Sequence, residues 1–251
     1  MNLEKINEYI EYLTNDKSSS EKIARILSEE YKINLYDCQE IKGSSGKTLV
    51  LIYDDIVIKI FPTIQKINDE VEVLLNVRSD YIIKLIGYNL EHNFIIYEKI
   101  QDWDELNENK LSFDKFYLKI CSVACALYDM HYKGYKHGDV FAGNIGINNK
   151  GNFVLYDLES AKKMPSEKNV TESEEMYWDV LNFLEDCIVR KYNNDQIQTL
   201  VKTLLNILRS DKYIKTTLVE VRSMGKMVKR SLKKYVYEAD DFVKLLVLLQ
   251  T

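Results

Sequence analysis

The sequence has few of the residues that form linkers, redox pairs or metal sites. Its 251 residues include only two prolines and nine glycines, so a proline- or glycine-rich linker between domains is not expected. The cysteines are Cys38, Cys121, Cys125 and Cys187, and none of them forms a C-x-x-C pair. Cys121 and Cys125 lie one helical turn apart in an apolar stretch, so buried free thiols are favoured there over a redox pair. With three histidines, none suitably spaced with a cysteine, a structural zinc site is not expected either.

Excess positive charge and long apolar runs are also missing. The 34 Lys and Arg against 39 Asp and Glu give a net charge of −5, which argues against a general nucleic-acid-binding protein. No run approaches the roughly 18 apolar residues of a membrane span, and the first residues lack the apolar core of a secretory signal. We therefore expect no nucleic-acid partner, no membrane span and a cytoplasmic protein, with secretion without a cleaved signal left open.

The length and composition fit a folded enzyme or binding domain. A chain of 251 residues can bury a substantial core in one large or two small lobes. Its 46% hydrophobic and 29% charged residues are ordinary for a soluble globular protein.

Residues 1–33 predict two amphipathic helices. Apolar residues recur at helical spacing in each, as Ile6, Tyr9, Ile10 and Leu13 and then as Ile23, Ile26 and Leu27. The favoured interpretation is that these helices pack on the outside of the next domain. Contact of residues 1–33 with a partner protein is the alternative.

The pattern then changes to strands. Residues Thr48–Tyr53 and Ile56–Phe61 flank Asp54-Asp55, which predicts a β-hairpin. Strict alternation in the second strand places Val57, Lys59 and Phe61 on one face. A lysine among apolar strand residues is usually either an exposed edge residue or a paired functional one.

The segment Gly43-Ser44-Ser45-Gly46 precedes this hairpin and has three interpretations. A Walker loop would need a glycine where Ile41 stands, and a helix rather than a β-rich run after it. A glycine-rich lid between two antiparallel strands fits the strand context better. A plain polar hairpin turn explains the residues about as well.

The stretch 137–163, HGDVFAGNIGINNKGNFVLYDLESAKK, carries the strongest chemical signal. Asp139 and Asn144 precede a short hairpin, whose strands are Ile145–Asn148 and Asn152–Tyr156, and Asp157 follows it. This arrangement predicts that the three side chains meet at one end of a sheet. Carboxylate and amide oxygens suit a hard cation such as magnesium, and hence phosphoryl transfer. Turn residues on a binding module remain the alternative.

Several elements in this order resemble the protein-kinase-like superfamily, which includes aminoglycoside and choline kinases. The D-x-x-x-x-N at Asp139 and the D-L-E at Asp157 resemble the catalytic loop and the metal-binding motif. The sequence also predicts a helix at Asn68–Val77 and a strand at Ile82–Tyr88. With V-I-K at Val57–Lys59 before them, they look like the third strand, the αC helix and the fourth strand of a protein kinase. The resemblance implies an α+β, bilobal protein-kinase-like fold. It would comprise an N-terminal helical extension (1–33), a small β-rich N-lobe with the αC helix (34–100) and a mainly helical C-lobe (101–251).

The resemblance also implies roles for individual residues, with ATP and Mg²⁺ as cofactors. The catalytic set would be Asp139, Lys59 and Glu70, with Glu72 or Asp69 as substitutes for Glu70 in the ion pair with Lys59. The nucleotide would be bound by Gly43, Ser44, Ser45, Gly46, Val57, Lys59 and backbone groups near Glu98 and Ile100, with Tyr97 at the gatekeeper position. The metal would be held by Asn144 and Asp157, and Asp179 would steady the catalytic loop.

Departures from the family pattern shape the expected activity. Gly138 stands where many protein kinases have the arginine that meets a phosphorylated activation loop, so no phosphorylation-dependent switch is expected. Phe141 replaces a phosphate-contacting lysine, and only about 20 residues separate Asp157 from Asp179. We expect a minimal Ser/Thr protein kinase, with a protein substrate favoured over a small molecule. A small-molecule kinase of the aminoglycoside or choline type and a catalytically inactive nucleotide-binding module are the alternatives.

Overall fold

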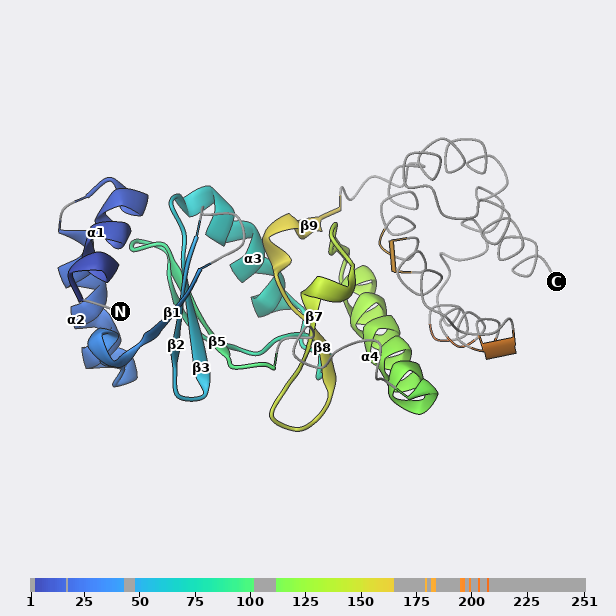
Figure 1. Ribbon diagram of the computed structural model, residues 1–251. Helices are drawn as coiled ribbons and strands as arrows, with labels where there is room; N and C mark the ends of the chain where they lie inside the picture. The colour runs from blue at the N-terminus through green and yellow to red at the C-terminus, as the bar shows by residue number, and fades with distance from the viewer. Residues whose placement is uncertain are drawn as a thin grey trace, which may run out of the picture.

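The computed structural model describes residues 3–16, 18–42, 48–101 and 112–164, together with residues 179, 182, 183, 195, 196, 199, 203 and 207. This part of the chain is a mixed α+β structure built around an antiparallel sheet (Figure 1). The predicted glycine segment 43–46 lies outside the described residues, and so does nearly all of the predicted helical region after residue 164.

The central sheet has five strands in the order β1-β2-β3-β5-β4, all antiparallel to their neighbours. The strands are β1 (Gln39–Lys42), β2 (Leu49–Tyr53), β3 (Ile56–Ile60), β4 (Leu85–Asn89) and β5 (Phe94–Glu98). The predicted hairpin is confirmed, since Tyr53 pairs with Ile56 and Asp54 takes the left-handed conformation with φ 49°. Aspartate is one of the few non-glycine residues that visit this region readily.

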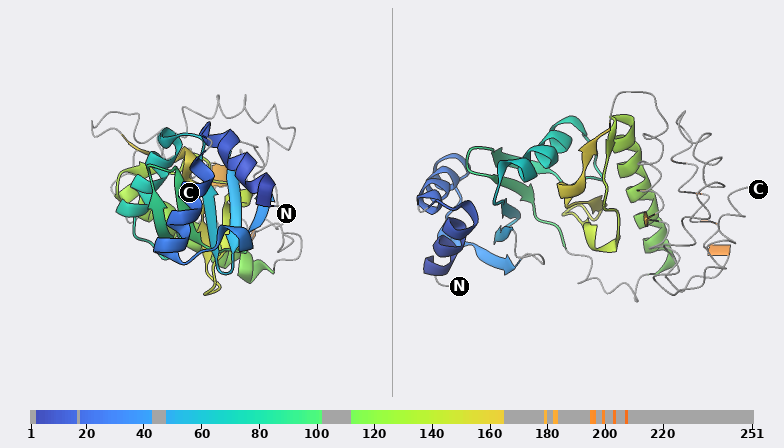
Figure 2. Two further views of the ribbon diagram at one scale, coloured as in Figure 1. Left: turned by 90° about the vertical axis from the view of Figure 1, so that its left-hand side faces the viewer. Right: turned by 90° about the horizontal axis from the view of Figure 1, so that it is seen from above.

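Two N-terminal helices cover one face of the sheet. These are α1 (Leu3–Thr14) and α2 (Ser19–Tyr31), which lie side by side beyond the strands (Figures 1 and 2). Their apolar stripes share one core with every second residue of the sheet, formed by Ile6, Ile10, Leu13, Ile23, Leu27, Leu49, Leu51, Ile58, Ile60, Phe94 and Ile96. The prediction that these helices pack on the adjoining domain is confirmed.

The opposite face of the sheet contributes to a second core. Helix α3 (Ile64–Asn76) packs there with the alternate residues of β5, Ile95 and Tyr97. Helix α4 (Phe113–Tyr132) belongs to the same core and packs on β6 (Tyr135–Lys136) and β8 (Phe153–Leu155). The helix predicted at 68–77 begins about one turn earlier, at Ile64. The strand predicted to begin at Ile82 begins at Leu85 instead, because Ile82 forms an isolated parallel bridge with Leu155.

Two short ribbons lie between α3 and α4. In one, β7 (Ile145–Ile147) pairs with β8 (Phe153–Leu155), which confirms the predicted hairpin. In the other, β6 (Tyr135–Lys136) pairs with β9 (Lys162–Lys163). The short helical turns η4 (Ala142–Asn144) and η5 (Leu158–Ser160) follow β6 and β8, and η1 (Leu35–Asp37) precedes β1. None of the described helices is long and apolar enough to cross a membrane.

Candidate active site

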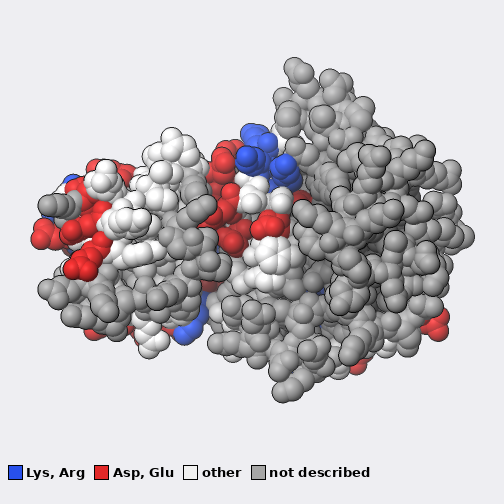
Figure 3. Space-filling view, turned by 45° about the horizontal axis from the view of Figure 1, so that its top comes forward, with Lys and Arg blue, Asp and Glu red and all other residues white. Residues whose placement is uncertain are grey.

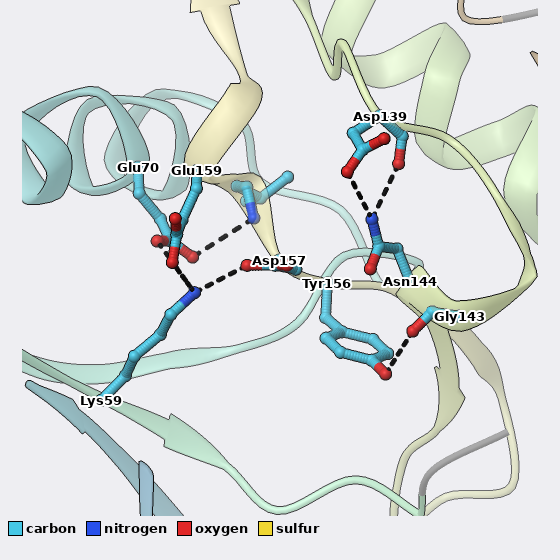
Figure 4. Close-up of polar contacts among 9 residues, drawn as sticks. Lys59, Glu70, Asp139, Gly143, Asn144, Tyr156, Asp157 and Glu159 are labelled. Atoms are coloured by element: carbon cyan, nitrogen blue, oxygen red, sulfur yellow. Dashed lines mark hydrogen bonds and ion pairs between the residues drawn. The ribbon is translucent and has the colours of Figure 1, made fainter. Parts of the chain in front are cut away.

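Lys59 is the centre of an ionic network that joins three segments of the chain. It lies on β3, opposite Ile95 of β5, and its side chain is on the α3 side of the sheet. Its Nζ is 2.6 Å from Asp157 Oδ1, 2.8 Å from Glu159 Oε1 and 3.8 Å from Glu70 Oε2 (Figure 4). The structure therefore pairs Lys59 with Glu70 of α3, the residue that the sequence favoured.

The carboxylates determine the charge of the lysine. Burial alone would lower the pKa of Lys59, but Glu70, Asp157 and Glu159 together raise this pKa above its usual value. Lys59 is consequently a fixed cation at neutral pH. Its Nζ also lies 5.1 Å from the ring centroid of Phe61, a distance at which the ring face favours a cation.

Glu70 is almost completely enclosed, with 1% of its side chain exposed. Burial raises the pKa of Glu70, and the positive charge of Lys59 opposes that rise. Its Oε1 accepts a hydrogen bond at 3.3 Å from the backbone N–H of Leu158, the residue directly after Asp157. Burial and the nearby Glu70 raise the pKa of Tyr97 well above its usual value, so the Tyr97 hydroxyl stays neutral. Glu70 thus links α3 both to the sheet and to the segment that carries Asp157.

The loop after β6 positions Asp139 and Asn144. The backbone N–H groups of His137 and Gly138 each donate to the Asp179 carboxylate at 2.7 Å. Asn144 Nδ2 donates to the Asp139 backbone oxygen at 2.9 Å and to its Oδ2 at 3.3 Å. The loop is therefore held at both ends, by Asp179 at its start and by Asn144 at its end.

Asp157 lies between these two groups of residues. It follows β8 in the left-handed conformation, with φ 58°, and Figure 4 shows it between Lys59 on one side and Asn144 with Asp139 on the other. Tyr156, the residue before Asp157, makes two hydrogen bonds to the loop that carries Asn144. Its backbone N–H donates to Asn144 O at 3.0 Å, and its Oη donates to Gly143 O at 2.5 Å. The predicted residues Lys59, Glu70, Asp139, Asn144 and Asp157 therefore share one region.

The other residues that the sequence predicted to bind the nucleotide lie in different surroundings. Val57 is half-buried on β3. The N–H of Glu98 already donates to Lys84 O at 3.1 Å, so this group is engaged within the sheet. Ile100 packs closely on Gly146, since a Cβ added to Gly146 would lie 2.7 Å from Ile100 Cδ1. The segment Gly43–Gly46 is not among the described residues.

Asn144 and Asp157 carry oxygen atoms of the kind that Mg²⁺ prefers as ligands. The amide nitrogen of Asn144 is used by Asp139, which leaves its Oδ1 as the group for a cation, and Asp157 already holds a cationic partner, Lys59. Mg²⁺ is commonly held by one or two protein oxygens, with water and phosphate oxygens completing its shell. Among the described residues, no group of three His, Cys, Asp or Glu side chains could hold a metal.

Two further residues of this region were not predicted from the sequence. Glu159 is the third carboxylate on Lys59, and Tyr156 ties β8 to the loop. The second carboxylate of the D-L-E motif was a signal for Glu159, whereas nothing in the local pattern pointed to the hydroxyl of Tyr156.

Comparisons with known proteins do not identify a relative: no protein-family model matches the chain, and no curated protein matches it. Any functional assignment therefore depends on the residues and their geometry.

Proposed function

We propose that this chain is an ATP- and Mg²⁺-dependent phosphotransferase with a bilobal protein-kinase-like fold, and that its acceptor is a hydroxyl group of a protein. The observation that carries the proposal is the network on Lys59. A lysine of a central strand contacts a buried helix carboxylate and an aspartate 98 residues away in the sequence. Residues chosen from sequence motifs alone thus meet in space with the charges that phosphoryl transfer requires.

Each residue then has a chemical role. Lys59 would neutralise nucleotide phosphates, and Glu70 would keep its Nζ in place. Asn144 and Asp157 would hold Mg²⁺, which supplies charge neutralisation at the phosphates when bound. Asp139 would orient the acceptor hydroxyl and take its proton while the hydroxyl oxygen bonds the γ-phosphorus. The bond from that phosphorus to the bridging oxygen breaks at the same time, and ADP leaves.

A small-molecule acceptor is the second candidate, and Phe141 is the observation that favours it. This side chain lies in the loop between Asp139 and Asn144, is 45% exposed and offers an apolar ring in place of a cation. An exposed ring beside Asp139 would suit an apolar or sugar face of a small acceptor. Both acceptors require the same phosphoryl chemistry, so the assay must include both.

The test is Mg²⁺-dependent transfer of label from γ-labelled ATP, with generic proteins in one set and aminoglycosides, choline and sugars in the other. Asp157→Asn should abolish transfer, and the matched control Asp55→Asn, at an exposed turn residue, should not. Label on protein supports the proposal, and label only on a small molecule supports the second candidate. ATP binding without any Mg²⁺-dependent transfer would contradict both and indicate a binding module.

A further inference from the structure

Glu72 lies two residues after Glu70 on α3 but has different partners. Residues two apart on an α-helix differ by about 200° in direction, so the two side chains leave the helix on nearly opposite sides. Glu70 is buried against Lys59, whereas Glu72 is 46% exposed. Tyr135 Oη donates to Glu72 Oε1 at 2.9 Å, and Lys163 Nζ lies 3.9 Å from the same oxygen.

These two partners belong to opposite strands of one ribbon. Tyr135 of β6 and Lys163 of β9 are paired in register, and α3 packs along β9. Basic and acidic side chains lie side by side on this face of the molecule (Figure 3). The ribbon is the base of both loops of the site: β6 leads directly into 137–139, and β9 follows directly after 157–161. A tie from α3 to this ribbon therefore acts on both loops at once.

Of the two contacts that Glu72 makes with the ribbon, the hydrogen bond from Tyr135 is stronger than the ion pair with Lys163. Tyr135 is 3% exposed, and burial together with the hydrogen bond and charge of Glu72 raises the pKa of Tyr135 to about 12. The hydroxyl is therefore a permanent donor at neutral pH. Lys163 is mostly exposed at a longer distance, and ion pairs of that kind contribute little.

We propose that Glu72 is a positioning residue that ties α3 to the β6–β9 ribbon and thereby holds Glu70 at Lys59. Both partners of the tie are unmodified side chains of this chain, so α3 is held in place without covalent modification. Its effect on catalysis depends on the phosphotransferase function proposed above, but the tie itself does not.

Hydrogen exchange of the unliganded protein tests the tie without any activity. In Glu72→Ala and Tyr135→Phe, amides of residues 64–76 should exchange roughly two- to tenfold faster, the effect of one lost hydrogen bond. Glu72→Gln keeps an oxygen that can accept from Tyr135 and should change exchange less. Asp69→Asn, an exposed change on the same helix, is the control. Exchange in Glu72→Ala and Tyr135→Phe equal to this control would overturn the proposal.

Single-turnover transfer then tests whether Glu72 acts through Glu70. In the wild-type background, Glu72→Ala should lower the transfer rate roughly two- to tenfold at temperatures where every variant is folded. In the Glu70→Gln background it should have little further effect on rate, although the thermal midpoint still falls. An equal rate loss in both backgrounds would overturn the positioning role. If the wild-type protein transfers no phosphate, the proposed function fails while the exchange result still decides the tie.

Discussion

The contact of Asp179 with the loop before Asp139 leads to a quantitative prediction for Asp179→Asn. Asp179 is 0% exposed and accepts from the N–H groups of His137 and Gly138 at 2.7 Å and from His131 Nε2 at 3.1 Å. A hydrogen bond to a charged group contributes about 1.5–3 kcal/mol. Asparagine keeps one oxygen acceptor but turns an NH₂ group toward the other donor. We expect Asp179→Asn to lower the free energy of unfolding by about 2–4 kcal/mol.

The same contact predicts how this difference depends on pH. Burial alone would raise the pKa of Asp179, but the hydrogen bond and charge of His131 and the groups at His137 lower this pKa below its usual value. A carboxylate with a lowered pKa in the folded state stabilises the protein fully above its unfolded pKa of about 3.9. That stabilisation is lost as the pH falls through the folded-state value. The part of the difference between wild type and Asp179→Asn that comes from the ionised carboxylate should therefore shrink as the pH falls below about pH 4.

Urea denaturation at several pH values measures both effects. The exposed Asp80→Asn is the matched control, and it should lie within about 0.5 kcal/mol of wild type. Asp179→Asn as stable as this control at neutral pH would refute the reasoning. A difference that does not shrink below about pH 4 would refute the assignment of a charged, hydrogen-bonded carboxylate.

Three further predictions concern the N-terminal helices, the third carboxylate and phosphorylation. Leu27→Ala should lower the free energy of unfolding by about 2–5 kcal/mol, because this residue of α2 is fully buried in the core shared with the sheet. Leu75→Ala, at an exposed position, should have little effect in the same urea titration. Glu159→Gln should tighten ATP binding roughly two- to fivefold by calorimetry, because it removes one anion that competes with phosphates for Lys59; weaker binding would contradict this role. Phosphatase treatment should leave the transfer rate unchanged because Gly138 cannot pair with a phosphate, and a strong gain after incubation with an upstream kinase would refute this.

Much of the fold around the site could be predicted because its local signals agree. Alternation in β3 placed Lys59 and Phe61 on one face, and Asp54-Asp55 supplied the turn before it. The choice among Asp69, Glu70 and Glu72 could also have been made from helical periodicity. Glu70 falls on the buried stripe of Ile67, Val71 and Leu74, whereas the other two carboxylates do not.

Other features depend on contacts between distant segments, which a local pattern does not specify. The hydroxyl of Tyr156 reaches Gly143, and Glu72 meets Tyr135 63 residues later in the sequence. The bend that brings Glu159 back to Lys59 comes from the turn η5, which directly follows the left-handed Asp157. Such contacts follow from tertiary packing and could not be predicted from spacing.

The most direct test of the proposed phosphotransferase compares wild type with Asp139→Asn in label transfer from γ-labelled ATP, with nucleotide binding measured on the same samples. The account predicts Mg²⁺-dependent transfer by the wild type. In Asp139→Asn, transfer should fall by roughly 10²- to 10⁴-fold, the range for loss of a general base, with ATP binding unchanged. Equal transfer by both proteins, or ATP binding by the wild type without transfer to any protein or small-molecule acceptor, would contradict it.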